Sequence, residues 1–371
     1  MLYALQRYLR CFAILGLVPW AEQRLQQRLQ KIYTIALIAL HIGVAFYIVV
    51  QDPPEEDLLV SMLVSCIVFI TQIVTMSVIE LQAMCQYGRY YALCLQFKCL
   101  RLRFQCELQQ TLKHLGWPSY VKFFALALLN VLSIVPSIYV VQHIDYIGYF
   151  WYSLGSVLII RFQCLLLLVY VELLGYHVEQ LQLRLQAVLN CRQSNSALDA
   201  KYEQLCSLEY LLSCKRAYME LYLLFGQFNG LYGWSIVCIF VVMFLDSMVN
   251  IYWTLLVLAD IYSFVFIYMT ISTFVPLLVL LFAFCRAGEY CRRQHMHIGS
   301  HVRALACTSQ RLREPAIHAY NSVLAEFTMQ VEQDALAISA EGFMDIDYSL
   351  LMSIFTAMVT YLIVLMQFGS I

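Results

Sequence analysis

Charged residues are scarce in this sequence. Only 13% of its 371 residues are Asp, Glu, Lys or Arg, whereas 62% are hydrophobic, and the mean hydropathy is +0.71. A soluble core of this size cannot hide so much apolar surface, so a lipid bilayer must be the solvent. The composition therefore indicates a membrane protein, and we expect no nucleic-acid partner.

The chain also lacks segments that would separate domains or direct cleavage. No Gly/Ser/Pro-rich linker and no internal repeat interrupts it, so we expect a single domain over residues 1–371. The first 31 residues are Gln-rich and contain five basic residues, without the short apolar region and cleavage site of a signal peptide. The first apolar segment is therefore expected to remain as a helix.

Long hydrophobic runs are present instead. Five have the roughly 20 residues needed to cross the hydrocarbon, and the apolar stretch 221–284 is long enough for two more. We place the turn within that stretch near either Asp246–Asn250 or Asp260. The sequence predicts an all-α membrane protein with seven transmembrane helices, over residues 32–50, 58–79, 120–141, 152–174, 223–246, 260–284 and 348–368.

Lysine and arginine are missing from every second connection. Five precede the first span, five lie between spans two and three, five between four and five, and six between six and seven, while the other connections and the end of the chain have none. Basic residues remain in the cytoplasm, so the N-terminus is expected there and the C-terminus outside. The cytoplasmic connections 80–119, 175–222 and 285–347 are expected to form an anchor.

These connections are expected to be helical. Two stripes of apolar residues recur at helical spacing in otherwise polar sequence. We expect them to pack together beneath the membrane, in one chain or between subunits, rather than to bind lipid. The stripes are Val178, Leu181, Leu185 and Val188, and Val323, Leu324, Phe327 and Val331. Gly342 is a predicted break before the last span. None of the 14 cysteines lies in an expected outside loop, which fits a reducing compartment.

Catalytic and metal-binding constellations are also missing. Cys and His recur at positions 291, 295, 297 and 301, but residues 295 and 297 point to nearly opposite faces of a helix. His41, His143 and His177 are scattered, and isolated histidines of this kind are usually structural. We therefore expect no enzyme activity, no metal and no cofactor.

The last span carries a polar stripe. Its residues share one face at about 100° per residue, and they are Ser349, Ser353, Thr356, Thr360 and Gln367. Small hydroxyl residues can let helices approach closely or can bond to their own backbone, so a structural role and a pore lining are equally favoured. A pore would require several copies of this helix around an axis.

At this span the sequence resembles a known family. Residues 360–368 read TYLIVLMQF and match the TYhhhhhQF signature (h, apolar) that closes insect gustatory receptors. The residues before this signature also match the pattern that is usual in the family, at Glu326-Phe327, Gly342-Phe343 and the DYSLL sequence of residues 347–351. The likeness at residue level therefore covers about the last 45 residues. Elsewhere the chain is similar to the family only in topology and length.

The resemblance implies a tetrameric, ligand-gated, non-selective cation channel. Each subunit would give its last span to the pore, and a tastant would bind in the outer half of spans two to six. The partners would be identical subunits or related gustatory receptors, membrane lipid and permeant cations, in the plasma membrane of a gustatory or other sensory neuron. Sugar-sensing members tend to carry Glu where this chain has Leu362, which disfavours a sugar and leaves a bitter compound as the default ligand.

Other seven-helix proteins remain as alternatives. An odorant receptor-type channel is the nearest, and a receptor or transporter of another class is less favoured. A G-protein-coupled receptor has its N-terminus outside, whereas a cytoplasmic N-terminus is expected here. A secondary transporter would show repeated halves with broken helices, and the sequence shows no such repeat.

The candidate gate is a ring of apolar side chains near the outer mouth of the pore. Ile363 and Val364 interrupt the polar stripe, and Gln367 and Phe368 end the helix. Such a ring can block ions by losing its water, above a conduit wetted by Thr360, Thr356 and Ser353. The alternative is that Gln367 and Phe368 only cap and pack the helix end.

Ligand-binding candidates gather near the outer ends of spans three to six. They combine aromatic faces with hydrogen-bonding groups, a mixture that suits a partly polar small molecule, although aromatic residues at these depths can also form an interfacial belt. Arg161 lies inside span four, where a charge must be paired or wetted. The candidates are Tyr139, Gln142, His143, Trp151, Tyr152, Arg161, Tyr252, Trp253, Asp260 and Tyr262.

Overall fold

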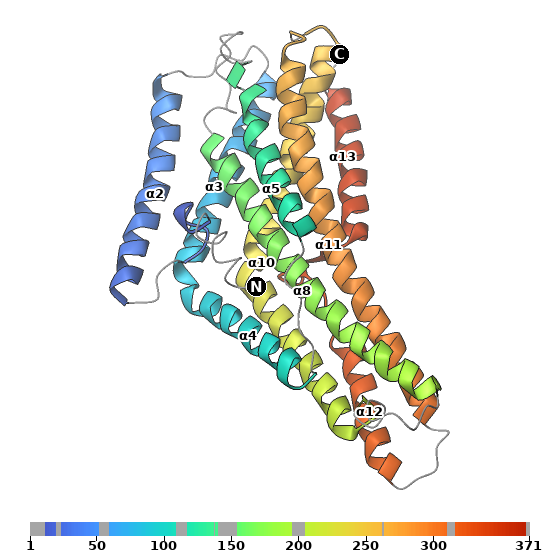
Figure 1. Ribbon diagram of the computed structural model, residues 1–371. Helices are drawn as coiled ribbons and strands as arrows, with labels where there is room; N and C mark the ends of the chain where they lie inside the picture. The colour runs from blue at the N-terminus through green and yellow to red at the C-terminus, as the bar shows by residue number, and fades with distance from the viewer. Residues whose placement is uncertain are drawn as a thin grey trace.

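The computed structural model describes residues 12–19, 24–51, 59–108, 117–136, 138–139, 154–194, 205–261, 263–309 and 316–368 (Figure 1). These residues are almost entirely α-helical, and one short β-ribbon joins the last two helices. The elements are α2 (Arg24–Gln51), α3 (Leu59–Cys85), α4 (Tyr87–Cys106), α5 (Trp117–Leu132), α8 (Leu154–Ser194), α10 (Leu208–Leu258), α11 (Phe266–Ser309), α12 (Ala316–Gln333), β1 (Ser339–Ala340), β2 (Met344–Asp345) and α13 (Tyr348–Phe368).

The apolar helices overlap all seven expected spans. Five helices in the described part of the chain are long and apolar enough to cross a bilayer, and two shorter apolar segments accompany them. The long segments are Gln27–Tyr47, Cys66–Cys85, Gly155–Arg192, Leu208–Leu258 and Thr270–Thr308, and the shorter ones are Val121–Pro136 and Tyr348–Val364. The chain is a multi-pass membrane protein by this composition, and the number of crossings remains a prediction.

The turn between α10 and α11 is at the second of its two expected positions. α10 runs through Asp246 and Asn250 without a break and ends at Leu258, beyond the expected end of span five at residue 246. Asp260 follows with a φ of 57°, a left-handed conformation that Asp tolerates better than most residues. Asp246 does not end the helix because its side chain has buried polar partners, which are described below.

Three helices continue past their apolar parts into the lower half of Figure 1, where α4 and α12 join them. The stripe on α8 is buried there, and the exposed fraction of Val178, Leu181 and Leu185 is 0%. Phe327 of α12 is also fully buried in the same core. The two stripes therefore pack inside one chain, and burial of each such side chain contributes about 1.5–3 kcal/mol.

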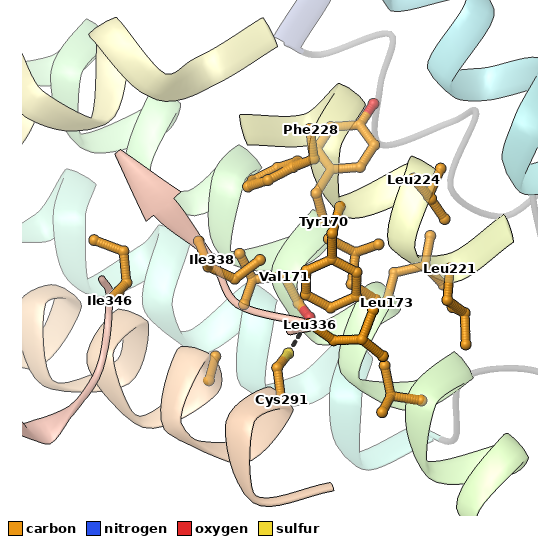
Figure 2. Close-up of a cluster of buried hydrophobic side chains, with 14 of the residues drawn as sticks. Tyr170, Val171, Leu173, Leu221, Leu224, Phe228, Cys291, Leu336, Ile338 and Ile346 are labelled. Carbon is orange, nitrogen blue, oxygen red and sulfur yellow. Dashed lines mark hydrogen bonds between the residues drawn. The ribbon is translucent and has the colours of Figure 1, made fainter. Parts of the chain in front are cut away.

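Figure 2 shows the buried side chains at the centre of this core, which come from α8, α10, α11 and the segment around β1 and β2. Tyr170 of α8 packs against Phe228 of α10, with ring centroids 6.3 Å apart. The Cys291 thiol of α11 donates to the carbonyl of Val171, at 3.6 Å. Continuous packing of this kind makes the lower extensions a rigid continuation of the upper helices.

His177 belongs to the same core and is a structural histidine. Its Nδ1 donates to the Leu173 carbonyl at 2.7 Å, and its ring lies against Phe97 and Phe104. Burial lowers the pKa of His177 to about 4, so the ring stays neutral near pH 7.

The β-ribbon brings α13 against α11. Gly342 lies in its turn with a φ of 73°, where the sequence predicts a break. A Cβ added to Gly288 of α11 would lie 2.0 Å from the carbonyl oxygen of Ile346, so only glycine lets the segment before α13 approach so closely. Asp347 then caps α13 by accepting from the backbone N–H of Leu350, at 3.0 Å.

Candidate functional site

α13 packs with one face only. Leu351 and Met358 are 8% and 2% exposed and lie on the side that contacts α10 and α11. The opposite face is open in the single chain, and Figure 1 shows α13 at the edge of the bundle, on the other side from α2. The residues on the open face include Ser353, Thr356, Thr360, Ile363, Val364 and Gln367, all of them exposed.

The hydroxyl groups of the stripe bond to the backbone of their own helix. Ser353 donates to the Ser349 carbonyl, Thr356 to the Met352 carbonyl and Thr360 to the Thr356 carbonyl, each at 2.9 Å. This is the bonding that a purely structural role predicts. Each oxygen still has lone pairs that can accept from water. The exposed stripe is therefore compatible with both interpretations.

The apolar residues of the candidate gate are also on the open face. Ile363 and Val364 are 47% and 38% exposed, although both are aliphatic. Gln367 is exposed one turn further on, and Phe368 is the last residue of α13, with its side chain outside the described part. Within the described part of the single chain, Ile363, Val364 and Gln367 are not covered by another helix, so a constriction at these residues must come from other copies.

α13 is connected to the bundle through aromatic contacts. Tyr361 meets Phe244 of α10 with ring centroids 5.9 Å apart, and Tyr348 stacks on Phe282 of α11 at 6.3 Å. A displacement of α10 or α11 would therefore reach the stripe directly.

Arg161 of α8 faces the protein interior. Its side chain is 5% exposed, and it donates to the hydroxyl of Ser133 at 2.8 Å and to the carbonyl of Thr273 at 3.2 Å. The Ser133 hydroxyl in turn donates to the Asn130 carbonyl, at 3.0 Å. The charge is thus bonded between three helical segments and kept away from lipid.

The bonds continue from Arg161 into α10 and α3. The Thr273 hydroxyl donates to the side-chain oxygen of Asn250, whose amide donates to the Asp246 carbonyl at 2.7 Å. Gln72 of α3 donates to the Asp246 carboxylate at 3.1 Å. Arg161 is thus connected to Asp246 through Thr273 and Asn250. We call these five residues, together with Ser133, the buried polar network, and it joins α3, α8, α10, α11 and the end of α5.

Two aromatic ligand candidates lie beside the network. Tyr252 and Trp253 of α10 are 4% and 6% exposed and pack on Val68 of α3, one helical turn from Gln72. Their side chains are covered by protein, whereas the aromatic residues of an interfacial belt are exposed at the membrane surface. The two aromatic residues thus follow Asn250 on α10, and Arg161 of α8 is connected to Asn250 through Thr273.

The other ligand candidates are not in this region or cannot be placed. Tyr139 is 52% exposed, and Asp260 is exposed in the turn after α10. Gln142, His143, Trp151, Tyr152 and Tyr262 lie outside the described residues.

Sequence reasoning missed most of the buried polar network. Asp246 and Asn250 were candidates for a turn, although polar residues four positions apart in an apolar helix also indicate a buried polar site. Gln72 and Thr273 give the same signal as isolated polar residues inside apolar runs. Ser133 has no distinguishing signal, because hydroxyl residues are common in membrane helices.

Comparisons with known proteins agree with this architecture. The sequence pattern of the 7tm chemosensory receptor family matches residues 5–371. The chain is 48% identical over 377 residues to "Putative gustatory receptor 39b" of Drosophila melanogaster, covering 100% of both chains. It is 30% identical over 156 residues to gustatory receptor 23a of the same organism, covering 42% of this chain and 40% of the relative.

The fold is also that of solved structures. The olfactory receptor OR5 from Machilis hrabei, in complex with eugenol, superposes with a TM-score of 0.71 over 98% of this chain and 99% of that chain. A second structure of the same receptor superposes with a TM-score of 0.69 over the same shares. Sequence identity is 12% in both cases, so the likeness is one of fold.

Proposed function

This chain belongs to the 7tm chemosensory receptor family, and from that premise we propose that it is a gustatory receptor subunit of a ligand-gated, non-selective cation channel. The family consists of receptors and not of enzymes. One observation carries the channel proposal: α13 packs with its apolar face and leaves its polar stripe open. Several α13 helices around an axis would enclose water with these stripes.

The proposed assembly has four subunits, identical or related. Met352 and Val359 flank the stripe and are 65% and 58% exposed, so neighbouring α13 helices or lipid must cover them. The exposed Ser353, Thr356 and Thr360 would then face the axis. Ile363, Val364, Gln367 and Phe368 would form the gate at its outer end.

The proposed ligand is a small tastant that binds near Arg161, Tyr252 and Trp253. Buried aromatic side chains near an arginine that is held by hydrogen bonds suit a molecule with an apolar body and a hydrogen-bonding group. Leu362 still disfavours a sugar, which leaves a bitter compound as the proposal. Relatives in sequence are gustatory receptors, so we favour this function over an odorant receptor, in a gustatory or other sensory neuron.

Electrical recording from cells that express the chain alone tests the channel. We expect Thr356→Cys channels, opened by compounds from a bitter panel, to be blocked by a membrane-impermeant thiol reagent added outside, because the side chain would line wetted space. Met358→Cys is the matched control, since Met358 is 2% exposed on the packed face and should not react. Equal block of both variants, or of the unmodified chain, would count against a pore lined by the stripe.

The proposed orientation has its own test. Glycosylation acceptor sites introduced at 52–57 should be modified, because these residues would be outside, and sites at 191–200 should remain unmodified in the cytoplasm. Gel mobility before and after enzymatic deglycosylation measures this. Modification at 191–200 would overturn the topology and the channel argument with it.

A further inference from the structure

A hollow lies between α4 and α10, two helices that contact each other in the lower half of Figure 1. Its volume is about 630 Å³, within the roughly 300–1,000 Å³ usual for ligand sites. Arg89 of α4 lines one side, and Tyr222, Gln227 and Gly230 of α10 line another. The residues around Ala337, between α12 and β1, complete the wall.

The chemistry of the lining favours an anion. Arg89 is the cation among the lining residues, and none of those residues is acidic. One of its guanidinium nitrogens donates to the Gly230 carbonyl at 3.4 Å, whereas the whole group has five N–H donors. The Tyr222 hydroxyl and the Gln227 amide add further donors. A planar guanidinium with such neighbours matches the oxygens of a phosphate group.

The position of the hollow corresponds to the cytoplasmic membrane surface. α4 begins directly after α3, and Tyr222–Gly230 includes the start of the expected fifth span. On α10, Leu223, Trp234 and Val241 are 48%, 53% and 43% exposed, at spacings of about three and two helical turns. These side chains offer an apolar track from the hollow into the membrane, with Trp234 between Leu223 and Val241.

We propose that this hollow binds the phosphate-bearing headgroup of an anionic phospholipid from the inner leaflet, with the acyl chains on the exposed track of α10. The assignment to the inner leaflet rests on the orientation given under the proposed function. Arg89 binds the phosphate, and Tyr222 and Gln227 donate to its oxygens or to the headgroup.

The wall of the hollow links the lipid to the pore helix. Asn229 holds the segment before β1, because its amide donates to the Ala337 carbonyl at 3.0 Å and its oxygen accepts from the Ser339 N–H at 3.2 Å. That segment leads through the β-ribbon to α13. A bound headgroup would therefore brace the base of α13.

Thermal unfolding of the full-length, detergent-solubilised receptor tests the site. We expect short-chain phosphatidylserine and short-chain phosphatidylcholine to raise the melting temperature, with half-saturation at an about fivefold lower concentration for phosphatidylserine. This ratio is the effect of one basic side chain near an anionic lipid. Arg89→Gln should abolish that preference, and Gln227→Leu should weaken it. Lys98→Gln removes an exposed cation of α4 outside the hollow and should preserve it.

Four results would overturn the proposal. The first is an equal response of the unmodified receptor to both lipids, and the second is a full preference in Arg89→Gln. The third is equal stabilisation by inorganic phosphate at matched ionic strength, which would assign the site to free phosphate. The fourth is a Tyr222→Cys disulfide between two copies, which would show that a second subunit fills the hollow. A receptor that shows the preference but passes no current would contradict the channel alone, because no current enters this measurement.

Discussion

Ile363→Ser should produce current without ligand. Ile363 is exposed on the stripe face of α13, where the polar lining becomes apolar. A ring of isoleucines at a pore axis would exclude water, and serine would let water return. We expect the ligand-independent current to rise at least about tenfold, the ratio that corresponds to ~1.4 kcal/mol in the opening equilibrium. Whole-cell recording, normalised to surface expression, measures it.

Val359→Ser is the matched control for this result. Val359 is an exposed aliphatic residue of the same helix, but it lies about 80° from the centre of the stripe. Its substitution also replaces an exposed aliphatic side chain with serine but does not wet the axis, so the current should stay at the level of the unmodified chain.

The two residues at the outer end of α13 extend this prediction. Gln367 and Phe368 are about 100° apart, so a rotation of the helix end by roughly a quarter turn would exchange one for the other at the axis. Phe368→Ser should therefore also conduct without ligand, and Gln367→Leu should reduce opening or alter ion selectivity. If these two variants and Ile363→Ser reach the surface and conduct like the unmodified chain, the gate lies deeper, at Thr360 or Thr356.

Arg161→Gln should destabilise the receptor strongly. The guanidinium donates to the Ser133 hydroxyl and to the Thr273 carbonyl, and it reaches the buried Asp246 only through Thr273 and Asn250. Leaving buried hydrogen-bonding groups without their partner costs about 1–3 kcal/mol for each group. We expect a lower melting temperature of the detergent-solubilised protein and reduced surface expression.

A double-mutant cycle measures the interaction between Arg161 and Asp246 separately from the destabilisation that each single substitution causes. Asp246→Asn should also destabilise, but Arg161→Gln with Asp246→Asn should cost less than the sum of the two by about 0.5–3 kcal/mol. Lys122→Gln is the comparison, because Lys122 pairs with Glu172 at a partly exposed position and should matter by less than about 1 kcal/mol. Strict additivity would rule out coupling between Arg161 and Asp246. If Arg161→Gln folds, gates and keeps its ligand profile, Arg161 has no role in the ligand pocket.

Most of the fold follows from the sequence for simple reasons. The length and polarity of an apolar run decide whether a segment can form a membrane helix, so α13 coincides with its expected span at 348–368. Helical periodicity also decides which residues share a face. The stripe on α13 and the buried stripe on α8 could therefore be located without a structure.

The sequence by itself determined the membrane solvent, the apolar helices, the polar stripe of α13 and the family signature, because each depends on residues that are near one another in the chain. Only the tertiary structure decided which faces meet. Asp246 could break a helix or be bonded within one, and its partner Gln72 is 174 positions away. The spacing of residues along a helix cannot select that partner, because the choice depends on how α3 and α10 pack against each other.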